Sequence, residues 1–102
     1  MNTWKLWVDD ERPAPDESWT WVTNSSSAIW MLSAGIHYAE ISLDHDLGGE
    51  DTGMIVLDFM SVHRIWPDTL TIHTANPPAR KRMLAAANAD GPPGMDIYIK
   101  HW

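Results

Sequence analysis

The sequence contains no cysteine, and this absence excludes two kinds of structure. A disulfide-stapled secreted domain needs cysteine pairs, and a zinc ribbon or an iron–sulfur site needs thiolate ligands. A chain without thiols fits a reducing compartment. We therefore expect a cytoplasmic protein whose fold depends on a hydrophobic core.

Long hydrophobic runs are also absent. The longest mostly apolar stretch, residues 54–60, is too short to span a bilayer and includes Asp58. The first residues do not show the basic and then apolar pattern of a signal peptide. We expect no membrane association.

Basic residues are few, with 7 lysines and arginines against 14 acidic residues and a net charge of −7. Nonspecific duplex binding depends on phosphate neutralisation, so duplex nucleic acid is not the expected partner. A small anionic ligand held at one basic spot is still compatible with this charge. With 102 residues and 44% hydrophobic residues, the chain reads as a single globular domain over residues 1–102.

Short strand-like and helical segments alternate along the chain. Strands are predicted at residues 3–9, 19–23, 40–44, 69–73 and 96–100, and helices at residues 25–34, 52–65 and 77–89. Such alternation indicates βαβ units and a parallel sheet. We predict an α/β fold with a five-stranded parallel sheet in the order 2-1-3-4-5, and about three helices mainly on one face.

The strands alternate between apolar and polar residues, although a sheet covered on both faces would read as continuous apolar runs. Residues 10–18 contain two prolines and are too short for a full helix, and the chain ends at Trp102 just after the last strand. We therefore expect an open second face that carries Trp7 and Tyr98. The 10–18 loop with Trp102, a second copy in a homodimer, or a different protein partner could cover it.

Acidic residues gather where the predicted strands end. Asp9 and Asp10 follow the first strand, and Asp44 and Asp46 surround the end of the third. Ligands bind outside the carboxyl ends of the strands in open α/β sheets, and hard cations take carboxylate oxygens. We expect a divalent cation, Mg²⁺, at Asp9, Asp10 and Asp44. Alternatively, Asp10 and Asp46 only cap the turns that follow them.

Basic residues lie near the same edge. Arg80 stands in the first turns of the helix that starts near residue 76, with two further basic residues, and Arg12 follows the first strand. A helix start attracts anions through its free amides. A phosphorylated small molecule or nucleotide would explain this concentration of positive charge. A solvated basic helix face is the alternative.

Several segments together resemble the receiver domain of response regulators, namely LWVDDERPAP, ISLDHDLGG, TIHTANPPAR and DIYIKHW. The resemblance implies an acidic pair at Asp9 and Asp10, a phosphoacceptor at Asp44, a hydroxyl residue at Thr74 and a lysine at Lys100. The segments VDDERPAP, LDHDLG and IHTANPPAR are more similar still to the cyclic-phosphate processing receiver-like family. That family has a trimmed receiver fold and is expected to act on nucleotides or other compounds with cyclic phosphates.

The resemblance to this variant family implies further site residues. Its additions to the ordinary receiver are His45, Asp46, His73 and Asn76. Catalysis is then assigned to Asp44, Asp46, His45, His73 and Lys100, and phosphate binding to Thr74, Asn76, Arg80 and Arg12. Histidine can protonate a leaving oxygen near neutral pH. Asp44 could attack phosphorus or hold the metal.

Two functions therefore follow as hypotheses. One is a metal-dependent phosphoesterase that acts on a cyclic-phosphate-containing nucleotide or related compound. The other is a receiver-like or pseudo-receiver interaction module, either with a phosphoacceptor at Asp44 or as an inhibitor or adaptor that binds a partner through the open sheet face.

Overall fold

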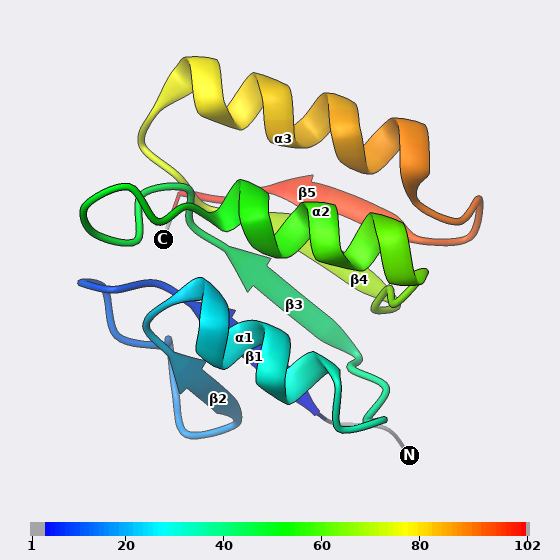
Figure 1. The fold of residues 1–102 in the computed structure, drawn as a ribbon, viewed down its shortest axis with the longest axis horizontal. Coiled ribbons are helices and arrows are strands. Elements are labelled where there is room, and N and C mark those ends of the chain that lie inside the picture. Colours follow the sequence, from blue (N-terminus) through cyan, green and yellow to red (C-terminus); the bar gives the residue numbers. More distant parts are fainter. Residues whose placement is uncertain (1–3, 102) are drawn as a thin grey trace.

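The computed structural model describes residues 4–101, which form one layer of helices on one five-stranded sheet (Figure 1). The elements follow the chain as β1 (Lys5–Val8), β2 (Trp19–Val22), α1 (Ser25–Leu32), β3 (Glu40–Leu43), α2 (Gly53–His63), β4 (Thr69–Ile72), α3 (Pro77–Asp90) and β5 (Asp96–Ile99). The sheet order is β2-β1-β3-β4-β5. The predicted α/β class, strand order and helix number are confirmed.

All four strand pairs are parallel, with Val8 opposite Val22 and Leu43, and Leu43 opposite Ile72. The strands therefore end in register, and the loops after β1, β3 and β4 meet at one edge of the sheet. The predicted start of the first strand at Thr3 lies outside the described residues. No helix within residues 4–101 has the length and apolar character that a membrane crossing needs.

Two of the three helices begin with an asparagine that acts as a cap. The side chain of Asn24 accepts a hydrogen bond from Ser27 N at 2.8 Å, and that of Asn76 accepts one from Ala79 N at 3.2 Å. These bonds satisfy amides that the helix itself leaves unpaired. Thr52 occupies the corresponding position of α2, but its side chain makes no capping bond.

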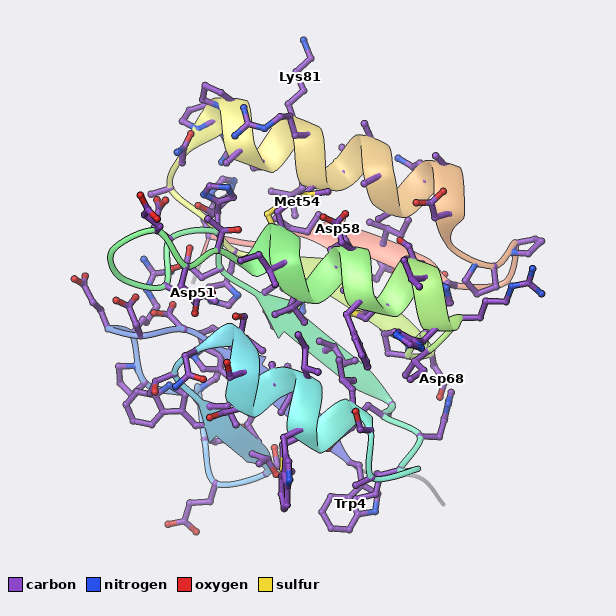
Figure 2. All side chains as sticks on the ribbon, in the orientation of Figure 1. Trp4, Asp51, Met54, Asp58, Asp68 and Lys81 are labelled. Atoms are coloured by element: carbon purple, nitrogen blue, oxygen red, sulfur yellow. The ribbon has the colours of Figure 1, made fainter. Side chains whose placement is uncertain are left out.

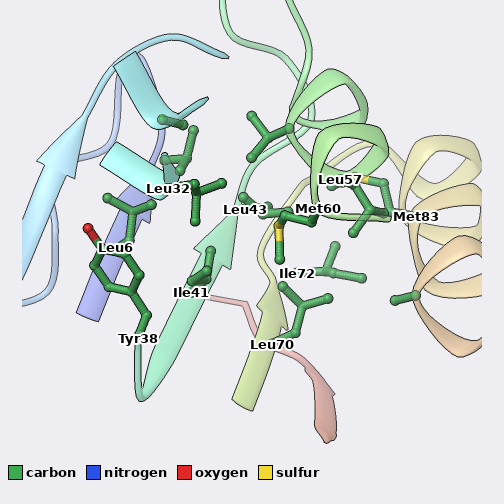
Figure 3. Packing of buried hydrophobic residues seen from close by; sticks show 14 of the residues in the cluster. Leu6, Leu32, Tyr38, Ile41, Leu43, Leu57, Met60, Leu70, Ile72 and Met83 are labelled. Carbon is green, nitrogen blue, oxygen red and sulfur yellow. The ribbon is translucent and has the colours of Figure 1, made fainter. Parts of the chain in front are cut away.

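The hydrophobic core fills the space between the helices and one face of the sheet (Figure 3). Its fully buried side chains from the strands are Leu6, Val8, Ile41, Leu43, Leu70 and Ile72. These are the apolar members of the alternating pattern, so period two predicted which face the helices cover.

Helix α2 lies between α1 and α3 (Figure 1) and exposes more apolar surface than its central place suggests. A helix that is apolar on nearly all sides is normally a buried one. Val56, Leu57 and Met60 are buried, but Val62 is 76% exposed and Ile55 is 43% exposed. With a single layer of helices, the outer side of the central helix still faces water.

The second face of the sheet differs from the prediction. Trp7 was expected on an open surface, but it is completely buried, together with Ser42 and Thr71 on the neighbouring strands. Tyr98, at the edge of the same face, is 51% exposed, as expected. Among the described residues, the exposed aromatic side chains on this face thus stand at its two edges, Tyr98 on β5 and Trp21 on β2, whereas the middle of the face is closed.

The loop between β1 and β2 explains this burial. The indole Nε1 of Trp7 donates a hydrogen bond to the backbone oxygen of Arg12 at 2.8 Å, which draws the loop over the ring. Trp19 meets the ring edge-on at a centroid distance of 5.6 Å, and His73 stacks on it at 3.9 Å. Of the three closures considered, the loop accounts for the β1 side. Trp102, the other residue expected to help, lies outside the described residues.

Candidate functional site

Asp9 directly follows β1 and is held in place from several directions. Its Oδ1 accepts hydrogen bonds from the amides of Glu11 at 2.9 Å and Arg12 at 2.8 Å. Its Oδ2 lies 3.0 Å from Nε2 of His73. Because the carboxylate is only 3% exposed, these bonds fix its position at the sheet edge.

Asp44 follows β3 and lies beside Asp9. Its Oδ1 accepts a hydrogen bond from the amide of His45 at 2.8 Å, and the Thr74 hydroxyl is a further partner. Burial, and then the charge of Asp9, raise the pKa of Asp44 from 3.8 to about 6, although these hydrogen bonds act in the opposite direction. An acid with this pKa exchanges protons close to neutral pH.

His45 and Asp46 continue the chain into the glycine-rich loop. Nδ1 of His45 lies 2.9 Å from Oδ1 of Asp46. The Asp46 side chain is 68% exposed, whereas that of His45 is 13% exposed. The pair therefore presents a carboxylate to solvent with an imidazole behind it.

The loop from residue 47 to residue 52 folds back on the end of β3. Gly48 and Gly49 have φ angles of 94° and 57°, which side chains disfavour. Asp51 lies at the start of α1 (Figure 2), and its Oδ2 accepts a hydrogen bond from Ser25 N at 2.8 Å. The loop is thereby fixed beside the acidic residues.

His73 ends β4 and lies beneath this acidic edge. Ser42 Oγ is 2.6 Å from Nδ1 of the ring, and Asp9 Oδ2 is near Nε2. Burial lowers the pKa of His73 from 6.5 to about 4, although the contact with Asp9 acts in the opposite direction. The ring is therefore neutral at physiological pH, and it orients the Asp9 carboxylate.

These groups surround a depression of about 510 Å³ at the carboxyl ends of the strands. Its lining consists of Asp9, Asp10, Glu11, Arg12, Asp44, Asp46, Gly48, Gly49, His73, Thr74 and Ala75. Asp9, Asp10 and Asp44 each offer one carboxylate oxygen, and these three oxygens lie within 4.8 Å of one another. Three hard oxygen donors at this spacing can hold a divalent cation.

A smaller depression of about 170 Å³ adjoins the first and has a basic side. It shares Arg12, His73, Thr74 and Ala75 with the larger one and adds Lys100 and His101. The two depressions together form a site with carboxylates on one side and cations on the other.

The predicted site residues divide into two groups. Seven of them line the larger depression, namely Asp9, Asp10, Arg12, Asp44, Asp46, His73 and Thr74, and Lys100 lines the smaller one. His45, Asn76 and Arg80 line neither of the two. The side chain of Asn76 is used as the cap of α3. The chemical roles assigned to all these residues remain predictions.

Sequence reasoning missed the contacts behind the site. Ser42 and Trp7 hold His73 from two sides, and the amides of Glu11 and Arg12 hold Asp9. The parity of the strands placed Ser42, Trp7 and His73 on one face, so their proximity could have been inferred. Closure by the 10–18 loop was one of the alternatives expected from the sequence, and the structure selects it for the β1 side.

A larger depression of about 840 Å³ lies away from this site. Its lining is His37, Ser61, Val62, Arg64, Trp66, Ala89, Asp90 and Pro92. It contains one acidic residue and no cluster of oxygen donors, so the volume alone does not make it the better candidate. We place the candidate functional site at the strand ends.

A scan against protein-family models gives one finding about relatives of this chain. The model described as the cyclic-phosphate processing receiver domain matches residues 4–89. The matched segment includes the residues of the acidic cluster and excludes β5 and Lys100. A search of curated proteins gave no match.

Proposed function

The chain belongs to the cyclic-phosphate processing receiver family, and from this membership we propose that it is a metal-dependent phosphoesterase acting on a cyclic phosphate of a nucleotide or related compound. The observation that carries the proposal is the cluster of Asp9, Asp10 and Asp44 in a depression that also contains Arg12 and Thr74. Carboxylates for a cation and groups for an anion then share one site. A cytoplasmic location belongs to the same proposal.

The donor set fits a divalent cation such as Mg²⁺. All three proposed ligands are carboxylates, and the pKa of Asp44 is raised partly by the neighbouring charge of Asp9. This is the repulsion expected among acids that face one another without a counter-charge. A cation held by Asp9, Asp10 and Asp44 would offset charge on the phosphoryl oxygens.

Arg12 and Thr74 are suited to hold the phosphate group of the substrate. Both line the larger and the smaller depression, and Lys100 adds a second cation from the end of β5. A guanidinium group and a hydroxyl can each donate hydrogen bonds to phosphoryl oxygens. We propose that these residues orient the phosphorus atom toward the carboxylates.

Asp46 is the residue that we propose for proton transfer. It lines the depression with an exposed carboxylate, and Nδ1 of His45, which does not line the depression, lies 2.9 Å from its Oδ1. In the reaction a water molecule adds to phosphorus, one ring P–O bond breaks, and the leaving oxygen receives a proton. The product is a phosphomonoester, and Asp46 accepts the proton that the attacking water loses and delivers it to the leaving oxygen.

Hydrolysis of a cyclic phosphodiester tests this proposal. We expect the purified protein to convert a 2′,3′-cyclic or 3′,5′-cyclic nucleotide to the monoester with Mg²⁺ or Mn²⁺ and not with a chelator. Asp10→Asn should lower the rate by about a hundredfold or more, as for loss of a charged group in a catalytic site. Asp58→Asn, an exposed change on α2, is the control (Figure 2). No turnover of any cyclic phosphate would contradict the proposal.

A second candidate function is that of a receiver-like phosphoacceptor. It is favoured by the contact of Asp44 with the Thr74 hydroxyl at the ends of adjacent strands. Incubation with acetyl phosphate, or with beryllofluoride, should then modify or occupy Asp44 without turnover of a cyclic phosphate. The reading as an inhibitor or adaptor is weakened, because Trp7 is buried and the surface proposed for the partner is smaller.

A further inference from the structure

Strand β2 forms one edge of the sheet, and its outer side is a template for another strand. Within residues 4–101, β2 pairs with β1 alone, and Figure 1 shows no helix or strand beyond it. Its four residues, WTWV, carry no charge, proline or glycine. Charged side chains and proline commonly protect natural edge strands, so the short length of β2 is its one such protection against pairing.

The direction of the backbone groups on β2 follows from one hydrogen bond. The carbonyl of Val22 accepts from Asp9 N at 3.1 Å, so Val22 points its backbone groups toward β1. In a parallel pair these groups alternate along the strand. The N–H and C=O of Trp21 therefore point outward, away from β1.

Exposed aromatic side chains flank this edge on both faces of the sheet. Trp21, which shares a face with Trp7, is 45% exposed, and Trp30 on α1 is 73% exposed. Trp30 and Met31 form an apolar groove with Val22 and the small side chains of Ser26 and Ser27. Exposed apolar area next to a strand edge that has no partner strand indicates an interface.

We propose that the edge of β2 pairs with the same edge of a second copy, antiparallel and centred on Trp21. The two Trp21 residues would exchange both backbone hydrogen bonds, and their indoles would meet on one face. Thr20 of each copy would lie opposite Val22 of the other, on the face that carries the helices. The grooves beside Trp30 from the two copies would then adjoin each other, so one patch serves both partners, as a two-fold interface requires.

The charges near β2 agree with a second copy as the occupant. In an antiparallel pairing centred on Trp21, the segment before β2, with Asp16 and Glu17, would lie beside the segment after β2 of the second copy, where α1 begins. Asp16 and Glu17 of one copy would thus lie at the opposite end of the pairing from the same residues of the other copy, beside a helix start whose own first turn has no acidic residue and where Asp51 contacts Ser25 N. Negative charge is favourable at a helix start. The net charge of −7 on each copy should weaken association at low salt.

The dimer would also touch the candidate site. Nε1 of Trp21 donates a hydrogen bond to the backbone oxygen of Asp9 at 2.7 Å. Fixing Trp21 at the two-fold axis would therefore restrain the end of β1. This inference does not depend on the proposed hydrolysis, and its tests measure mass and cross-linking only.

Sedimentation from low micromolar to near-millimolar concentration is the first test, and we expect a monomer–dimer equilibrium that salt strengthens. Trp30→Lys should weaken dimerisation by about tenfold or more, because it places a charge in the buried part of the interface. Val62→Lys changes an equally exposed apolar residue on α2 and should leave the equilibrium unchanged. A monomer at all concentrations would assign the edge to another occupant and overturn the proposal.

A single cysteine gives a second test, since the chain has none of its own. In the proposed register the two Trp21 Cα atoms are about 5.5 Å apart, within disulfide range. Trp21→Cys should form a cross-linked dimer on oxidation or with a short bis-maleimide, whereas Tyr98→Cys at the other edge should not. Cross-linking at position 98 with none at position 21, or a dimer that Trp30→Lys leaves intact, would refute this register.

Discussion

Asp44 is the residue whose ionisation most directly opposes folding. Its folded-state pKa of about 6 lies above the ordinary value of 3.8, so the fold favours the protonated form. Stability is therefore lost as the pH rises from about 3.8 to about 6. His73 acts in the opposite sense, because its folded-state pKa of about 4 lies below 6.5, and stability is lost as the pH falls between these values.

Asp44→Asn should therefore stabilise the metal-free protein above about pH 7. The expected gain is on the order of 2 kcal/mol, allowing for solvent screening at a half-buried group. It should vanish near pH 3.8, where the unfolded carboxyl also begins to carry a proton. Urea unfolding of the wild-type protein and of Asp44→Asn, both in chelator, measures the difference between their free energies of unfolding. His73 contributes equally to both proteins, so its contribution cancels in this difference.

The same pair of proteins tests the cation. Millimolar Mg²⁺ should stabilise the wild-type protein, because a ligand of the native state raises stability, and should leave Asp44→Asn much less affected. A wild-type melting temperature that does not respond to Mg²⁺ or Mn²⁺ would remove the cation from the site. A variant less stable than wild type in chelator would show that the charge of Asp44 does not oppose folding.

Thr71 makes a different prediction at the scale of one residue. It is fully buried, and its hydroxyl has no hydrogen-bond partner among the described residues. An unpaired buried hydroxyl is unfavourable, and valine has nearly the same shape. Thr71→Val should raise the free energy of unfolding by about 1 kcal/mol. Chemical denaturation measures this, and a destabilised variant would indicate a partner for the hydroxyl in solution.

Among the elements, the close contact between the start of α2 and the residues that follow β3 positions the acidic cluster. Gly53 begins α2, and its amide donates a hydrogen bond to His45 O at 2.7 Å. A Cβ at this position would lie on the backbone oxygen of Asp44. The close approach of helix and strand end is therefore the reason why glycine stands here.

Gly53→Ala should destabilise the protein by about 2 kcal/mol or more, since backbone must move to relieve the contact. It should also weaken binding of Mg²⁺, because Asp44 moves with its carbonyl. Gly94→Ala is the matched control, as no atom lies within 4 Å of its Cβ position. Thermal unfolding and a metal titration give both values, and equal melting temperatures for the two variants would refute the account.

The whole molecule has two layers on its sheet, although only one of them is made of helices. The three helices cover one face, and the loop after β1 covers the β1 side of the other through Trp7. The burial of Trp7 therefore also supports the candidate site, because Trp7 stacks on His73, which in turn contacts Asp9.

Trp7→Ala should lower the free energy of unfolding by about 3–5 kcal/mol, as for other buried large-to-small changes. Trp30→Ala, measured at a concentration where the protein is monomeric, should change it by about 0.5 kcal/mol or less. Denaturant unfolding followed by circular dichroism compares the two variants. Similar losses for both would show that Trp7 is not part of the core.

The sequence by itself determined the fold class, the strand order and the place of the acidic residues. The fold class and the acidic edge follow from the alternation of strands with helices and from the rule that parallel strands end at one edge. Asp9, Asp10 and Asp44 were expected together because they follow β1 and β3, which are neighbours in the predicted order. Each segment that resembled the cyclic-phosphate processing receiver family is a short continuous stretch of sequence, so the resemblance could also be recognised without the structure.

Only the tertiary structure decided which residues are buried on the sheet face opposite the helices. Period two assigned Trp7 and His73 to that face, but whether they are buried depends on a loop that returns from residues 10–18. The path of a loop also depends on contacts between residues far apart in sequence, here Trp7 with His73 and His73 with Asp9. Burial then fixed the protonation of His73 and Asp44, because the pKa of a group depends on its lost hydration and on nearby charges that no local pattern contains.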